Sequence, residues 1–139
     1  MAEPSSAAPP VPPPPDPLLT LARVTFHTND EDKDSDTFVE VEVQSSQRTV
    51  VAKLSDWLGH FDDHSDAGPF TLVMVQPVQR SQLRTGSVII RASADFHDTW
   101  RFNFVVDLLF EDGAHLLARA NGVELKSRIN TVQQSFGIE

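Results

Sequence analysis

In this chain of 139 residues, the side chains whose types and spacing could do chemistry lie in an acidic run between positions 30 and 36. Four aspartates alternate along the run, at Asp30, Asp32, Asp34 and Asp36. Carboxylates gathered on one loop repel one another unless water or a cation separates them. Alternate residues of an extended segment point the same way. The aspartates could therefore converge on a calcium ion, which takes six to eight oxygen ligands.

A second acidic cluster lies in the stretch from 55 to 69, which we expect to be a long loop. Its carboxylates, Asp62, Asp63 and Asp66, complete a pool of calcium ligands of which not all can bind one ion. Three apolar residues stand beside this cluster, just before it in sequence: Trp57, Leu58 and Phe61. Exposed at a loop tip, they could contact a membrane, a glycan or a protein. Folded back, they would close the end of the core.

Other kinds of site were compared with the calcium loop. An EF-hand fails in either register, because starting at Asp30 puts Ser35 at the glycine position and Val41 at the bidentate glutamate, and starting at Asp32 fails at both positions again. A zinc site of nitrogen and oxygen ligands could use the aspartates of the second cluster with three histidines: His60, His64 and His97. The acidic turns could also be merely solvated, as most charge runs are.

The elements that must position these residues follow from the apolar pattern. Residues 1–17 contain eight of the ten prolines, so we predict a disordered or polyproline II leader followed by one domain over 18–139. Valines at 39, 41 and 43 alternate with glutamates, the period of a strand with one buried face. Similar arguments predict strands at 23–28, 39–43, 49–52, 70–75, 87–91 and 100–110, with 70–75 in the centre of a sheet.

The C-terminal part carries one strong turn signal. Asn121-Gly122 separates two apolar runs, which predicts a hairpin there. Residues 129–139 would form a closing strand or a tail. Short strands with frequent turn signals and no long helical stripe predict an all-β chain folded as a single antiparallel β-sandwich.

Two blocks of the sequence resemble a known family. The first runs from Val24 through Asp30 and resumes at Asp36-Thr37-Phe38-Val39-Glu40-Val41; the second pairs Val88–Arg91 with Trp100–Val106. Together they are similar to the lipoxygenase-type PLAT β-sandwich, in the order strand, calcium loop, strand, then strand, loop and Trp-led strand. The resemblance implies a calcium-binding sandwich. The first loop is more acidic than the glycine-rich loop of that family, and Asn121-Gly122 has no counterpart in it.

Composition excludes several functions. The net charge of −9 opposes binding to nucleic acid and to a bare anionic membrane. Without cysteine there is neither a disulfide nor a thiolate nucleophile or ligand, and no Gly-x-Ser-x-Gly or phosphate-binding glycine motif occurs, so we expect no enzyme. No apolar run is long enough for a membrane span, and we expect a soluble chain of open localisation.

The sequence leaves two hypotheses of function. The first is a calcium-binding module that contacts a membrane, glycan or protein through its acidic loops. The second is a structural module that self-associates through strand edges, with calcium stabilising the fold or playing no part.

Overall fold

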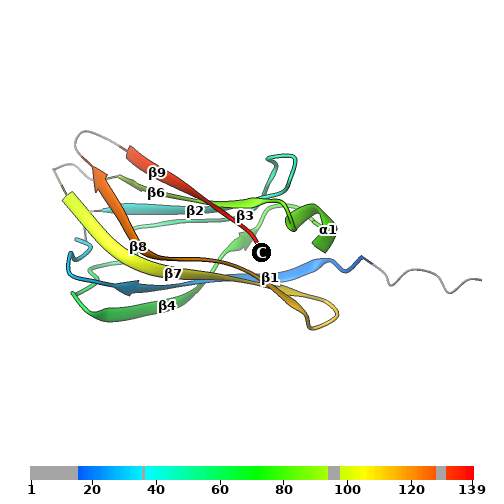
Figure 1. Ribbon diagram of the computed structural model, residues 1–139, viewed down its shortest axis with the longest axis horizontal. Helices are drawn as coiled ribbons and strands as arrows, with labels where there is room; N and C mark the ends of the chain where they lie inside the picture. The colour runs from blue at the N-terminus through cyan, green and yellow to red at the C-terminus, as the bar shows by residue number, and fades with distance from the viewer. Residues whose placement is uncertain (1–15, 36, 94–97, 128–130) are drawn as a thin grey trace, which may run out of the picture.

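Two antiparallel sheets pack face to face in the computed structural model, which describes residues 16–35, 37–93, 98–127 and 131–139 (Figure 1). The prediction of an all-β sandwich is confirmed. Asp36 of the predicted ligand pool and His97 of the zinc alternative lie outside the described residues.

The first sheet has four strands in the order β4 (Ser65–Thr71), β1 (Leu19–Thr28), β7 (Asp98–Phe110) and β8 (His115–Ser127). The second has five, in the order β5 (Val73–Met74), β3 (Val50–Asp56), β2 (Phe38–Gln44), β6 (Ser87–Ser93) and β9 (Thr131–Gly137). A four-residue helix, α1 (Arg80–Leu83), precedes β6. It is too short to cross a membrane, and no other helix of the described ranges could do so.

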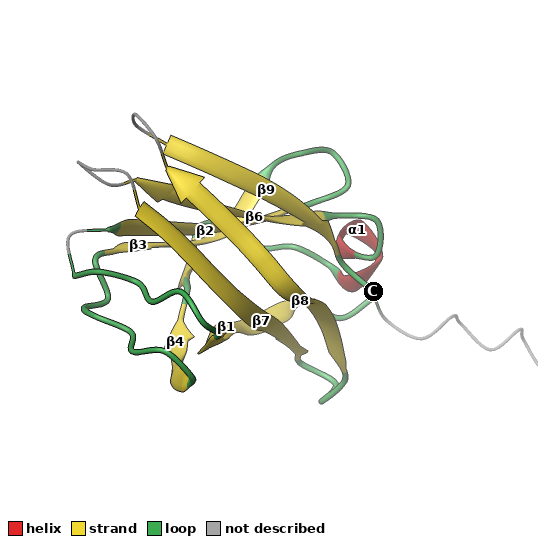
Figure 2. Cartoon of the chain, turned by 60° about the vertical axis from the view of Figure 1, so that its left-hand side comes forward, coloured by secondary structure: helices red, strands yellow, loops and turns green. Residues whose placement is uncertain are grey.

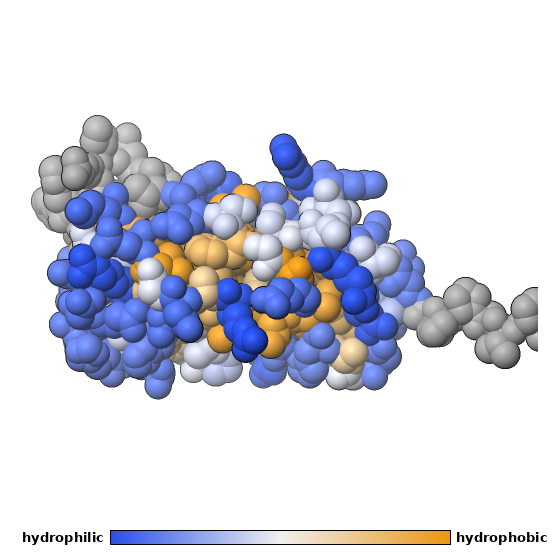
Figure 3. All heavy atoms as spheres, viewed as in Figure 1, coloured by the Kyte–Doolittle hydropathy of each residue, from blue (hydrophilic) through white to orange (hydrophobic). Residues whose placement is uncertain are grey.

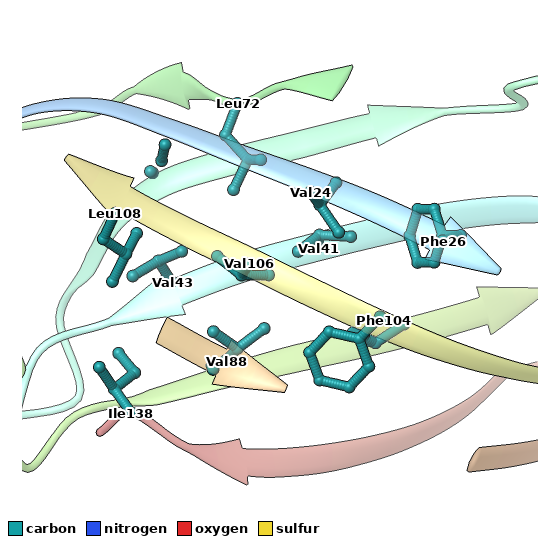
Figure 4. Packing of buried hydrophobic residues seen from close by; sticks show 14 of the residues in the cluster. Val24, Phe26, Val41, Val43, Leu72, Val88, Phe104, Val106, Leu108 and Ile138 are labelled. Atoms are coloured by element: carbon teal, nitrogen blue, oxygen red, sulfur yellow. The ribbon is translucent and has the colours of Figure 1, made fainter. Parts of the chain in front are cut away.

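The core lies between the sheets because alternate residues of the central strands point inward. Val24 and Phe26 of β1, Val41 of β2, and Phe104 and Val106 of β7 are all at most 2% exposed, and Figure 4 shows these side chains meeting between the two layers. Each fully buried side chain of this size contributes roughly 1.5–3 kcal/mol. The period-2 pattern that predicted the strands is thus also the pattern of the core.

One side of the sandwich is closed by β8 and β9, which lie side by side (Figure 2). The Gln134 side-chain amide donates to the Glu124 carbonyl at 2.8 Å. Beyond the end of β9, the N–H of Glu139 donates to the Leu117 carbonyl at 2.9 Å. Strands of the two sheets are therefore joined along this side by hydrogen bonds as well as by apolar contact.

The predicted hairpin at Asn121-Gly122 is wrong, because β8 runs through both residues without turning. On β7, Phe102 pairs with Val123 and Phe104 with Ala120, so Asn121 and Gly122 together oppose one residue. This is a β-bulge, with Gly122 at φ +66°. The bulge shifts the inward-facing positions by one residue, from even numbers before it to odd numbers after it.

The predicted central strand at 70–75 is also wrong. Its residues divide between two edge strands, because β4 ends at Thr71 and β5 begins at Val73 in the other sheet. Leu72 joins the two sheets and is 2% exposed, with its side chain in the core (Figure 4). Val73 and Val75 are 69% and 54% exposed. A continuous apolar run is typical of a strand buried on both faces, but here only part of the run is buried.

Contacts with the sandwich begin before residue 18. The Arg80 N–H donates to the Pro17 carbonyl at 3.0 Å, and the Ser81 N–H donates to the Asp16 carboxylate at 3.1 Å. The Ser81 hydroxyl also donates to Asp16. Asp16 therefore caps an N–H of α1 from outside the helix, a role that favours a charged carboxylate. Both residues were assigned to the leader from the sequence.

Candidate functional site

Both acidic loops lie at the end of the sandwich opposite α1, on the left in Figure 1. One follows β1 and covers residues 29–37; the other follows β3 and covers residues 57–64. Hydrophilic residues dominate this end in Figure 3, whereas apolar atoms show in the middle of the same face. The predicted loop of 55–69 is shorter in the structure because β3 continues to Asp56 and β4 begins at Ser65.

Backbone hydrogen bonds hold the first acidic loop on both sides. The Asn29 N–H donates to the Arg101 carbonyl at 2.8 Å, and the Arg101 N–H donates to the Glu31 carbonyl at 3.1 Å. On the other side Lys33 and Phe61 exchange two hydrogen bonds, at 2.9 and 3.1 Å, as an isolated antiparallel bridge. Residues 29–33 therefore lie between β7 and the second loop, held on both sides.

The Lys33 side chain is the feature around which the two loops are arranged. It is fully buried, and its Nζ lies over the Phe61 ring, 4.9 Å from the ring centre. Nζ donates to the carbonyls of Trp57 at 2.6 Å, Gly59 at 2.5 Å and Asp34 at 3.1 Å. A buried ammonium is costly unless its donors are satisfied, and these carbonyls satisfy them.

The local backbone of the second loop aims its carbonyls at Lys33. Leu58 and Gly59 adopt left-handed conformations, with φ of +61° and +81°. The Asp56 carboxylate accepts the N–H groups of Trp57 at 2.6 Å and Leu58 at 3.3 Å. This turn brings the carbonyls on either side of Leu58 to one ammonium, so the loop is shaped as a cradle for a cation that the chain itself supplies.

Three side chains at the surface of this end bring metal-binding atoms together. One donor atom from each of Asp32, Asp34 and His60 lies within 4.8 Å of the others. Nε2 of His60 is 3.4 Å from Oδ2 of Asp32 and 2.9 Å from Oδ1 of Asp62. Three of the predicted ligands, Asp32, Asp34 and Asp62, thus lie close to a histidine that the sequence analysis assigned to a different metal.

The other predicted ligands lie apart from this group. Oδ2 of Asp30 accepts a hydrogen bond from Arg101 at 3.3 Å, and Arg101 also donates to Glu124 at 2.7 Å. That hydrogen bond lowers the pKa of Glu124 and raises the pKa of Arg101. Asp66 lies 2.7 Å from Nδ1 of His27 on the outer face of the sheet. Asp63 and His64 are exposed.

The three apolar residues of the second loop have different environments. Phe61 is 5% exposed and packs against Phe26, Phe70 and Trp100 with ring centres 5.7–6.1 Å apart, so its ring is in the core and is not presented to a partner. Leu58 is half-buried against the core. Trp57 is 52% exposed and meets the Phe38 ring edge-on at 5.0 Å.

Lys33 is the important residue that sequence reasoning missed, although the sequence carries a signal for it. Because alternate residues of an extended segment point to opposite faces, a segment that turns Asp32 and Asp34 outward turns Lys33 inward. The alternation was used for the acids and not for the lysine between them.

Comparison with known proteins gives no match. No family model fits this chain, and neither a curated protein nor a solved structure is significantly similar to it.

Proposed function

We propose that this chain is a non-enzymatic binding module that holds a divalent cation at Asp32, Asp34 and His60 and meets a partner at the same end. The observation that carries the proposal is the approach of these three donor atoms to within 4.8 Å of one another. They come from two loops that the Lys33 and Phe61 bridge fixes against each other. Preorganised ligands bind an ion at a smaller entropic cost than ligands on free loops.

The donor set supports zinc better than calcium. Zinc accepts imidazole nitrogen and carboxylate oxygen together, commonly in fourfold coordination, whereas calcium takes six to eight oxygens. Asp30 and Asp66 are engaged with Arg101 and His27, so they do not add oxygens to this group. Calcium, the ion expected from the sequence and from the PLAT resemblance, is the alternative to be tested beside zinc.

The buried ammonium of Lys33 limits how tightly this group of residues can bind a cation. Lys33 lies between two of the ligands in sequence and adds a positive charge to the same loop. A like charge nearby weakens cation binding. We therefore expect a dissociation constant for calcium on the order of 10⁻⁴ M or weaker, as in the weaker calcium modules.

Thermal unfolding of the full chain in chelator, calcium, magnesium and zinc tests the cation. An ion that binds only the folded state adds about 2.7 kcal/mol at 100 times its dissociation constant, which corresponds to a rise of roughly 5 °C or more in the unfolding midpoint. We expect zinc to give the largest rise. If no ion raises the midpoint, the cation proposal is wrong.

Variants identify the ligands and the ion. Asp32→Asn combined with Asp34→Asn should abolish every ion-dependent shift, and His60→Gln should abolish the zinc shift while leaving any calcium shift largely in place, because calcium does not need the imidazole. Glu31→Gln combined with Asp63→Asn is the matched control, since it also removes two charges from the same end, at exposed residues outside the group. A loss of the shift in this control would indicate nonspecific attraction.

Trp57 supports the partner half of the proposal. Its half-exposed indole stands three residues before His60, so a bound ion and an aromatic contact would act at one surface. Co-sedimentation with neutral and anionic vesicles and glycan-array binding, each with zinc, calcium or chelator, separates a membrane from a glycan partner. Trp57→Ala should remove ion-dependent binding and leave the thermal shift intact. A relationship to the PLAT sandwich belongs to the same proposal and rests on the two sequence blocks.

Self-association is the second candidate, because Val73, Met74 and Val75 are exposed at the edge strand β5. The edge itself is poorly suited to pairing, since β5 has two residues and the neighbouring edge strand β4 contains Pro69. Oligomers that form with rising concentration and are indifferent to chelator would favour this candidate.

A further inference from the structure

The outer face of the four-stranded sheet has a groove that is separate from the acidic end. Its volume is about 390 Å³, and its lining comes from β1, β4, β7 and β8. This volume lies within the range of about 300–1,000 Å³ that is usual for small-molecule sites. The groove is independent of the cation proposed above, because it contains none of the three donor residues.

Two β-bulges lie beside the groove, one opposite Thr25 and the other opposite Asn103, two residues apart along the sheet. On one side Gly68 and Pro69 of β4 together oppose Thr25 of β1; on the other, Asn121 and Gly122 of β8 together oppose one residue of β7. A bulge bends its strand and increases the local twist. Between the bulges the paired central residues, Thr25 and Val105, have short side chains. Val105 is 39% exposed and offers an apolar floor.

The two ends of the groove carry different polar groups. At one end Nδ1 of His27 lies 2.7 Å from Oδ1 of Asp66, whose side chain is 79% exposed. This contact leaves the second imidazole nitrogen and the second carboxylate oxygen for a ligand. At the other end are the Arg119 guanidinium and the Asn121 amide, which have no side-chain partner within the described part of the chain. His27 and Arg119 are on strands two spacings apart, about 10 Å.

The chemistry of these ends defines one kind of ligand. A guanidinium without a protein partner binds a carboxylate through two parallel hydrogen bonds. An imidazole, a carboxylate and an amide around an apolar floor suit hydroxyl groups on a compact carbon skeleton. A doubly charged phosphate is disfavoured, because Asp66 and the net charge of −9 oppose a second negative charge.

We propose that this groove binds a small polyhydroxy carboxylate, the class that includes sugar acids, with the carboxylate on Arg119 and the hydroxyls toward His27, Asp66 and Asn121.

The proposal is tested by titrating the full chain with three probes at equal ionic strength: glucuronate, glucose and acetate. Heteronuclear NMR records the amide signals at each step of the titration. Glucuronate should shift the amide signals of Thr25, Val105 and Arg119 in a saturable manner. Glucose lacks the carboxylate and acetate lacks the hydroxyls, so each should bind more weakly by about tenfold or more. No saturable shift with glucuronate overturns the proposal, and equal binding of glucose or acetate overturns the proposed ligand class.

Two variants and a control place the ligand. Arg119→Gln should weaken glucuronate binding by about tenfold or more. Val105→Trp should abolish binding by filling the groove, and because Val105 is partly exposed the variant should keep the spectrum of a folded chain. Lys126→Gln is the matched control, since it removes one positive charge from the same face of β8 beyond the groove. Unchanged binding in Arg119→Gln, or an equal loss in the control, contradicts the proposed site.

Discussion

Lys33 carries a charged group into the interior, where most lysines are not found. The effective cost of removing an ion from water is several kcal/mol, and it is recovered here by hydrogen bonds to three carbonyls and by the Phe61 ring. The same carbonyls depend on the ammonium in turn. The two acidic loops are thus joined by a contact that is expensive to break from either side.

Removing this charge should therefore destabilise the fold strongly. Lys33→Met keeps an apolar stem of similar length but leaves three carbonyls without their donor, so we expect the free energy of unfolding to fall by about 3 kcal/mol. Lys53→Met is the control, because Lys53 is 43% exposed in its side chain and lies 3.9 Å from Glu40 on the surface. It should cost no more than about 0.5 kcal/mol. Urea unfolding measures both, and equal costs would contradict the role given to Lys33.

The bulge in β8 decides which side chains of that strand enter the core. Leu116 and Ala118 before it and Val123 and Leu125 after it are all at most 7% exposed. Without the extra residue the last two would face solvent, because a one-residue shift moves every later side chain to the other face. The same bulge forms one wall of the groove.

A substitution at Gly122 tests whether the bulge depends on the left-handed backbone conformation at this residue. Its φ of +66° is unfavourable for residues with a Cβ, although a Cβ there would meet no atom within 4 Å. Gly122→Ala should cost about 1–2 kcal/mol from the backbone alone. Gly137→Ala in β9 is the control, because that position is equally open and has no left-handed φ, so it should be close to neutral. Chemical denaturation of both variants is the measurement, and a neutral Gly122→Ala would refute the backbone explanation.

The alternation of apolar residues was sufficient to predict the strands whose two faces differ. β2 and β7 were located in this way because Val39, Val41 and Val43, and Trp100 to Val106, bury every second residue. The prediction failed where local signals have two meanings. Asn121-Gly122 suits a hairpin turn and a bulge equally, since both place a residue at positive φ, and only the pairing with β7 distinguishes them.

The candidate site was also predictable only in part, because local spacing indicates which side chains share a face but not which distant residues they meet. Spacing along one loop indicated that Asp32 and Asp34 share a face, and the structure brings them together. The partners of Asp30 and Asp66 come from Arg101 and His27, which are distant in sequence. Contacts of that kind depend on which strands are neighbours, and no local pattern reports them.

At the scale of the whole molecule, three carboxylates with lowered pKa values join separate parts of the chain. Asp16 is hydrogen-bonded by Ser81, which lowers its pKa, and the pKa of Asp112 is lowered chiefly by the Ala114 N–H and then by Arg80. The hydrogen bond from Arg101 lowers the pKa of Glu124. Each charged form is therefore preferred in the folded state. Its stabilising effect is complete above the ordinary pKa and is lost as the pH falls through the lowered value.

The ordinary values are 3.8 for aspartate and 4.5 for glutamate, so we expect the three groups together to lose their effect as the pH falls below these values. The triple variant Asp16→Asn, Asp112→Asn and Glu124→Gln should be less stable than the parent at pH 7, and the difference should shrink steadily as the pH falls below the ordinary values. Urea unfolding across these pH values measures it.

A control is needed because protonation also relieves repulsion within a chain of net charge −9. Glu31→Gln, Asp63→Asn and Glu139→Gln remove the same number of charges at exposed positions. This variant should not reproduce the loss of stability at pH 7. If the two triple variants behave alike, the effect belongs to total charge and not to the three hydrogen-bonded carboxylates.

Both ends of the described chain lie near α1, one strand length, about 30 Å, from the acidic loops (Figure 1). Pro17 is held there by Arg80, and Glu139 pairs with Leu117. A dye, a surface linker or a second protein attached at Glu139 would therefore stand at the far pole of the molecule. Chain immobilised in this way should present every copy in one orientation, with the loops and Trp57 directed into the solution.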